Sequence, residues 1–329
     1  MPTSLIFLLS ATAVVLAGMR LARDGDTIAE QTGLGRAWVG AILVAGATSL
    51  PELSTNSYSV MLGNVNLAAG DLFGSNMVNM LILALADVSV RQQHILTRVA
   101  MNQALVGTLA IWLTAAAIAG VVAGPTVTVL GLGWGTIAIL IGYVAGTRVL
   151  FANRTLPAFE SWTEAAEHRA SAPPLRPAII MFAIAAAIIF VAAQFLATSA
   201  ADLADQLGVS KGFVGVAMLA IVTSLPEAIV SVSSIRNGSY DLAVGNLLGS
   251  NCFNMVIFVV LDIVDGPGSV LARIDGALVI GGAFAILLVG LALIDILHRA
   301  ERRIWLMEPG PGLMIPTYLL GLYFVYQIG

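Results

Sequence analysis

The 329-residue chain has little charge and almost no cysteine. Only 10% of its residues are charged, against roughly 25% in a typical soluble domain, and 58% are hydrophobic. This balance, with a mean hydropathy of +0.94, predicts a multi-pass membrane protein surrounded by a lipid bilayer. The single cysteine, Cys252, excludes an internal disulfide and fits neither a thiolate metal site nor a redox pair. A net charge of −4 is too small to indicate acidic or basic partners, and we expect no nucleic-acid partner and no obligatory protein partner.

Histidine is also scarce. His94, His168 and His298 fall in expected loops or at helix ends, so a buried Ser–His pair or an HExxH zinc site cannot form. We therefore expect neither an enzyme nor a cofactor. The first apolar run begins at Thr3 with no basic flank before it, which favours a transmembrane helix over a cleaved signal peptide.

Apolar runs long enough to cross a membrane, at roughly 20 residues each, occur ten times. They lie at Thr3–Leu21, Ala37–Leu62, Leu67–Leu85, Val99–Ala123, Val127–Leu150, Ala178–Ala197, Phe213–Ile235, Leu242–Ile263, Ile274–Ile296 and Leu313–Gln327. A polar stretch that contains Pro173-Pro174 separates the two sets of five. The expected organisation is a first five-helix repeat over 1–151, a cytoplasmic linker over 152–177 and a second repeat over 178–329.

The two halves match without gaps at an offset of 175 residues. Between 39–83 and 214–258, about 20 of about 45 positions are identical, which indicates an internal duplication. Because five crossings per half is an odd number, the second half must enter the membrane in the opposite direction. The predicted fold is an all-α polytopic protein of ten transmembrane helices arranged as two inverted repeats, a construction typical of secondary transporters.

The basic residues indicate the orientation in the membrane. If the N-terminus is outside, every lysine and arginine except Lys211 and Arg273 falls on the cytoplasmic side. We expect a multi-pass protein of the cell (inner) membrane with both termini extracytoplasmic.

The sequence Thr-Ser-Leu-Pro-Glu occurs at 48–52 and again at 223–227, each time inside an apolar segment. A carboxylate near the centre of a spanning segment costs about 3 kcal/mol, and such residues usually mark an ion or proton path. The proline before each acid lacks an N–H, so the second and seventh helices should break there and expose carbonyl oxygens. No intramembrane Lys or Arg is available to neutralise Glu52 or Glu227, although pairing for structure alone is the competing interpretation.

A second motif, Gly-Ser-Asn-x-x-Asn, occurs at 74–79 and 249–254 and should form the facing wall. Its glycines allow close helix approach, while its polar side chains could instead bond only a neighbouring helix. Carboxylate, hydroxyl and carbonyl oxygens together suit hard cations such as calcium and sodium. The candidate ligands are the side chains of Glu52, Glu227, Thr48, Thr223, Ser49, Ser224, Ser75, Ser250, Asn79 and Asn254.

Three other acids lie outside this set. Asp87 and Asp262 occupy matched positions at helix ends, where we expect them to be interfacial, with guiding of ions as the alternative. Asp71 precedes Ser75 by one turn, and a helix-start role is favoured over an accessory role in the site.

At these motifs the sequence resembles the sodium/calcium exchanger family of the cation/calcium antiporter superfamily, in its compact prokaryotic form. The resemblance implies four cation positions between the second, third, seventh and eighth helices. It implies calcium at Glu52 and Glu227 with Thr48 and Thr223. It implies sodium at Ser75 and Ser250 and at the carbonyls of Ala45 and Ala220. It further implies that the first and sixth helices slide across the remaining bundle.

The chain departs from the family pattern at two pairs of positions. Asn79 and Asn254 are both amides where some members carry one aspartate, which leaves proton coupling open. Ala47 and Val222 replace frequent glycines. The expected function is calcium/sodium antiport by alternating access; a proton-coupled antiporter of calcium or another divalent cation is the nearest alternative, and a cation channel is a more distant one.

Overall fold

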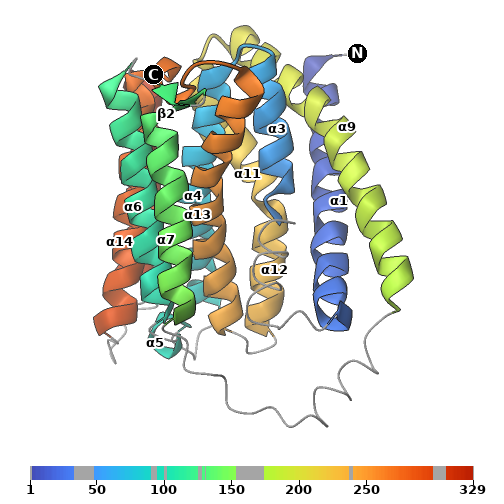
Figure 1. Cartoon of the computed structure of the whole chain (residues 1–329), viewed down its shortest axis with the longest axis vertical. Coiled ribbons are helices and arrows are strands. Elements are labelled where there is room, and N and C mark those ends of the chain that lie inside the picture. Colours follow the sequence, from blue (N-terminus) through green and yellow to red (C-terminus); the bar gives the residue numbers. More distant parts are fainter. Residues whose placement is uncertain are drawn as a thin grey trace.

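Figure 1 shows a computed structural model of the chain, which forms a bundle of helices. The structure describes residues 2–32, 48–89, 95–99, 102–124, 128–129, 131–152, 174–236, 240–298 and 309–328. Within these ranges the protein is helical apart from one two-stranded hairpin.

The described helices follow the predicted segments. The first half contains α1 (Thr3–Thr32), α3 (Leu50–Met61), α4 (Val65–Ser89), the single turn α5 (Ile95–Arg98), α6 (Asn102–Ala123) and α7 (Trp134–Ala152). The second half contains α9 (Leu175–Leu207), α10 (Lys211–Val214), the π-helical turn Gly215–Leu219, α11 (Ala220–Thr223), α12 (Leu225–Arg236), α13 (Tyr240–Asp265), α14 (Val279–His298) and α15 (Pro309–Ile328). Two short 3₁₀ turns, Leu271–Arg273 and Gly276–Leu278, precede α14.

Among the described residues, six helices are long and apolar enough to cross a membrane. A seventh span results if the bent pair Lys211–Thr223 and Leu225–Arg236 is taken as one crossing. Two shorter apolar helices, Trp134–Leu150 and Gly312–Ile328, coincide with two further predicted segments. The upstream part of the expected second span lies outside the described residues, so the count of ten crossings stays a prediction.

Several boundaries differ from the prediction. Helix was expected from residue 127 onward, but β1 (Thr128–Val129) pairs antiparallel with β2 (Leu132–Gly133). Gly131 lies in the turn with φ +82°, a conformation that ends a helix and that few other residues adopt. The helix α1 also continues well past its apolar run, and Arg20 pairs with Asp24 one turn later at 2.7 Å.

The centre of the bundle is built around α4 and α13. Of the six candidate spans, the one in α4 is the most enclosed by the rest of the protein. Phe73 of α4 contacts Phe258 of α13 with ring centroids 5.6 Å apart. Because these two helices carry the second repeated motif, their burial removes its polar side chains from lipid.

Glycines let the backbone of α4 come into direct contact with the backbone of α10 and of the π-helical turn Gly215–Leu219. A Cβ atom placed on Gly70 would lie 2.2 Å from the Gly212 carbonyl oxygen, and one on Gly215 would lie 2.5 Å from the Leu67 carbonyl oxygen. Only glycine permits this approach, which places Asp71 and Ser75 of α4 beside the break between α11 and α12.

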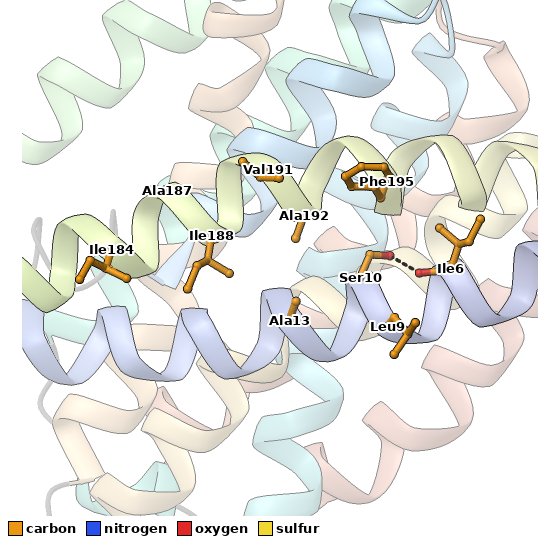
Figure 2. A pocket seen from close by; sticks show the side chains of 10 residues that line it. All are labelled: Ile6, Leu9, Ser10, Ala13, Ile184, Ala187, Ile188, Val191, Ala192 and Phe195. Atoms are coloured by element: carbon orange, nitrogen blue, oxygen red, sulfur yellow. Dashed lines mark hydrogen bonds between the residues drawn. The ribbon is translucent and has the colours of Figure 1, made fainter. Parts of the chain in front are cut away.

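The helices α1 and α9 lie side by side at one edge of the molecule and run in opposite directions (Figure 1). Gln206, near the end of α9, donates to the Thr3 hydroxyl at the start of α1 at 2.8 Å. Between them is an apolar groove of about 790 Å³ (Figure 2). The residues that line it are Ile6, Leu9, Ser10, Ala13, Ile184, Ala187, Ile188, Val191, Ala192 and Phe195.

On its inner side α1 contacts both broken helices. A Cβ atom on Gly18 would lie 2.6 Å from Cγ of Pro226 and 3.5 Å from Cγ of Pro51. The helix α1 therefore passes directly over the two prolines that precede Glu52 and Glu227 in the sequence. Figure 1 also places both ends of the chain at the same end of the bundle.

The glycine crossing gives a direct test of the packing. Replacing Gly70 with Ala should destabilise the protein by about 1–3 kcal/mol, because the added methyl group meets a backbone carbonyl that cannot rotate away. Thermal unfolding in detergent, followed by size-exclusion chromatography, measures the change. Gly290→Ala in α14 is the matched control, since a Cβ there meets nothing within 4 Å. Equal midpoints for the two variants would contradict the described crossing.

Candidate cation site

Each repeated Thr-Ser-Leu-Pro-Glu motif departs from helical geometry at its serine. Ser49 precedes α3 with φ −87° and ψ 7°, and Ser224 separates α11 from α12 with φ −84° and ψ 2°. The helical segments Lys211–Thr223 and Leu225–Arg236, on either side of Ser224, are bent by 45° relative to each other. The two halves thus adopt the same backbone conformation at equivalent residues, as predicted from the prolines.

Each break places its glutamate in the first turn of a new helix. Glu52 is the third residue of α3 and Glu227 the third residue of α12, and their exposed fractions are 1% and 0%. The free N–H groups and the positive end of the helix dipole favour a negative charge at this position. The local sequence therefore stabilises a buried carboxylate without a basic side chain.

Hydroxyl groups from both halves contact Glu227. Ser49 of the first half donates to Oε1 of Glu227 at 3.5 Å, and Ser250 of the second half donates to the same oxygen at 3.3 Å. The Thr48 side chain also hydrogen-bonds to Glu227.

Around the other acid, the Thr223 side chain hydrogen-bonds to Glu52 and its hydroxyl oxygen lies 3.4 Å from that of Ser75. The two carboxylates are close enough to interact electrostatically. The site is therefore formed jointly by both halves.

The amides of the second motif clamp α4 to α13 by reciprocal contacts. Asn76 Nδ2 donates to the Asn251 backbone carbonyl at 3.3 Å, and Asn251 Nδ2 donates to the Asn76 carbonyl at 3.3 Å. Asn79 then donates to Asn251 Oδ1 at 2.9 Å, while Asn254 donates to Asn76 Oδ1 at 3.1 Å. Each bond made by a residue of α4 is thus matched by an equivalent bond from α13, as expected for a contact with two-fold symmetry.

Asn76 and Asn251 were not among the predicted site residues. Their identity in the two repeats was the available signal, but spacing alone does not show that an amide orients another amide. Their contacts direct the amide nitrogens of Asn79 and Asn254 toward each other's helix, which leaves the amide oxygens of those two residues for another partner.

Several buried oxygens in this region have no hydrogen-bond partner among the described residues. They are Oε2 of Glu52, Oε2 of Glu227, Oδ1 of Asn79, Oδ1 of Asn254 and Oγ of Ser224. Buried polar atoms are normally paired, so a group of unpaired acceptors at one place requires an explanation. A bound cation would satisfy them.

The donor set is suited to a hard cation. None of the ion pairs formed among the described residues includes Glu52 or Glu227. Within the same ranges, no three His, Cys, Asp or Glu side chains gather at metal-binding distance. The available ligands are two carboxylates with hydroxyl and amide oxygens, the chemistry that calcium and sodium prefer.

The remaining predicted residues are only partly placed by the structure. The Ala220 carbonyl accepts from the backbone N–H of Ser224 at 3.1 Å and from the Thr223 hydroxyl at 3.5 Å. Ala45 and Ala47 lie outside the described residues. Thr48 and Ser49 are fully buried and begin the described part of this region.

The three further acids are all buried inside the protein. Asp87 and Asp262 lie in the last turns of α4 and α13, as predicted, and their interfacial position in the membrane stays a prediction. Asp262 accepts from the backbone N–H of Gly133 at 2.9 Å, from the Thr136 hydroxyl at 2.6 Å and from the N–H of Val270 at 2.7 Å. These bonds hold the hairpin and the loop before α14 to α13.

The helix-start interpretation of Asp71 is wrong. Asp71 lies in the second turn of α4 and contacts Asn56 and Thr223. The sequence spacing could not show this, because the contacts come from the two broken helices.

Comparison with known proteins agrees with the fold and the motifs. The family model described as sodium/calcium exchanger protein matches residues 3–147 and 177–328. The inner membrane protein YrbG of Escherichia coli is 26% identical, over 97% of this chain and 96% of its own length.

Two solved structures share the fold. A crystal structure of the H⁺/Ca²⁺ exchanger CAX has a TM-score of 0.73 at 14% identity and covers 100% of this chain and 85% of its own. The sodium-calcium exchanger NCX_Mj has a TM-score of 0.63 at 19% identity and covers 98% of both chains. Because the family model matches most of the chain in two blocks, the chain belongs to the sodium/calcium exchanger family.

Proposed function

We propose that the protein is a secondary antiporter that exchanges calcium for sodium across the membrane by alternating access. The observation that carries the proposal is the joint site of Glu52 and Glu227, two buried acids from different halves with unpaired oxygens. Their mutual repulsion makes a vacant, doubly charged site unfavourable, since unit charges about 5 Å apart repel by roughly 3 kcal/mol at an effective dielectric near 20. Cations must therefore occupy the site before it closes to one side of the membrane and opens to the other. This favours coupled exchange over uncoupled passage of calcium.

In the proposed site, calcium binds between the two glutamates with the Thr48 and Thr223 hydroxyls completing its shell. Their contacts across the two halves support this role. Sodium binds at Ser75 and Ser250 with the carbonyls of Ala45 and Ala220, and the oxygens of Asn79, Asn254, Ser49 and Ser224 form the surrounding wall. The unpaired oxygens on Asn79, Asn254 and Ser224 support the wall assignment.

The proposed architecture is ten crossings in two inverted repeats, 1–151 and 178–329, with a cytoplasmic linker at 152–177 and extracytoplasmic termini. The opposite directions of α1 and its counterpart α9 support the inversion, as does the reciprocal clamp between α4 and α13. Contact of Gly18 with both prolines supports a role for the α1–α9 pair in opening one side of the site at a time.

A proton-coupled antiporter of calcium or another divalent cation, with the same fold, is the second candidate. Asn79 and Asn254 support it, because both positions carry amides and neither can provide a further carboxylate for sodium. Solved exchangers of this fold include proteins described as H⁺/Ca²⁺ and as sodium-calcium exchangers, so the fold is compatible with both coupling ions.

Replacing Glu52 or Glu227 with Gln should lower calcium transport by roughly 100-fold or more, because a charged ligand to the ion is lost while the side-chain shape is kept. The measurement is ⁴⁵Ca²⁺ uptake by proteoliposomes, with folding checked by size-exclusion chromatography. Asp205→Asn is the control, since this acid at the end of α9 is largely exposed and pairs only loosely with Lys211 at 3.8 Å. Retained calcium uptake in a folded Glu→Gln variant would refute the assignment.

The coupling ion is decided by comparing gradients. Calcium release from loaded proteoliposomes should accelerate when sodium is added outside and should respond little to an imposed pH gradient. The reverse result would select the proton-coupled candidate. Release at full speed with no counter-cation present would contradict exchange and favour a channel.

Changing Asn254 to Asp should alter the sodium dependence of calcium flux, since a negative charge is added where a buried amide oxygen is unpaired. The half-saturating sodium concentration in the proteoliposome assay measures this. An unchanged sodium dependence would mean that this side chain is not in the site.

A further inference from the structure

A third acid, Asp71, lies beside the glutamates on one side of the site only. It is fully buried in α4, and its Oδ2 accepts from Asn56 Nδ2 at 2.6 Å. Its Oδ1 accepts from the Thr223 hydroxyl at 3.1 Å. Asp71 therefore connects α3, α4 and α11, and it also interacts electrostatically with Glu52.

The equivalent positions in the second half show that packing does not require this acid. Asn246 stands 175 residues after Asp71, and Ser231 stands 175 residues after Asn56. Asn246 Nδ2 donates to Ser231 Oγ at 3.1 Å, so the same two helices are joined there by an amide and a hydroxyl. Because a neutral pair performs the structural task, the charge of Asp71 has another purpose.

The surroundings of Asp71 contain neutral oxygens suited to an ion. The Asn56 side chain is fully buried, its nitrogen is bonded to Asp71, and its Oδ1 has no hydrogen-bond partner in the part of the chain that the structure describes. The Thr223 hydroxyl lies 3.1 Å from the Leu219 carbonyl and 3.4 Å from Ser75 Oγ. With one proton on that hydroxyl, its oxygen keeps lone-pair capacity for a cation.

The charge balance selects a monovalent ion. None of the ion pairs among the described residues includes Asp71. A calcium ion between Glu52 and Glu227 balances those two charges, and one negative charge remains at Asp71. An isolated buried carboxylate is costly, so a single positive charge next to it is favoured.

We propose that Asp71, with Asn56, Thr223 and Ser75, forms an additional binding subsite for a sodium-sized monovalent cation in the first half of the protein. The inference rests on the proposed antiport function and deepens it by assigning an acid to sodium. The Thr223 hydroxyl donates to Asp71 and also lies beside Glu52, so an ion at this subsite and calcium between the glutamates compete for its oxygen. That competition couples sodium binding to calcium release.

The test is ²²Na⁺ binding to the purified full-length protein in detergent, which does not depend on transport. Asp71→Asn should raise the half-saturating sodium concentration at least about tenfold and remove about one bound sodium, because the only carboxylate of the subsite is lost. The double variant Asp71→Asn with Asn56→Ser reproduces the Asn246–Ser231 pair, so it keeps the helices joined if the single variant folds poorly. Asp205→Asn is the surface control and should bind sodium like the original protein.

Three outcomes would overturn the subsite. They are unchanged ²²Na⁺ binding in both Asp71 variants, absence of ²²Na⁺ binding to the original protein, and a loss of ⁴⁵Ca²⁺ binding in Asp71→Asn as large as that in Glu52→Gln. The last result would place Asp71 in the calcium shell. Calcium transport, measured separately in proteoliposomes, tests the antiport function, so failure of the subsite and failure of the function are distinguishable.

Discussion

Two carboxylates are buried in an apolar bundle without a basic partner, and the rest of the structure accommodates them. Burial of an unpaired charge is costly, so each acid is placed where backbone chemistry lowers the cost. The serine of each motif departs from helical geometry, and the proline and glutamate then lie in the first turn of the following helix, at the positive end of its dipole. Hydroxyls from the opposite half complete the surroundings, so neither half forms the site alone.

The duplicated sequence becomes a two-fold contact at the second motif. The amides of Asn76 and Asn251 exchange equivalent hydrogen bonds, which fixes α4 and α13 in one register. This clamp is neutral and fully internal, so it can persist whether or not an ion is bound between the glutamates. It also orients the amides of Asn79 and Asn254, whose oxygens are left without partners.

Symmetry is incomplete, and its exceptions are informative. Asp71 and Asn246 occupy equivalent positions, but only the first carries a charge. Likewise Asn56, which donates to Asp71, is replaced by Ser231 at the equivalent position of the second half. A site with different charges on its two sides can hold two kinds of ion, which exact repetition would not provide.

The sequence alone determined the membrane setting, the duplication, the helix breaks and the acids at their centre, because these follow from local properties of the chain. Hydropathy, a missing proline N–H and the cost of a buried acid act wherever such residues occur. Only the tertiary structure decided which residues from the two halves meet: the amide clamp of Asn76 and Asn251, the contact of Asp71 with Thr223, and the bonds of Asp262 to the hairpin. Those contacts depend on how helices distant in sequence cross, and crossings are set by close packing at glycines such as Gly70 and Gly215, which spacing along one helix does not reveal.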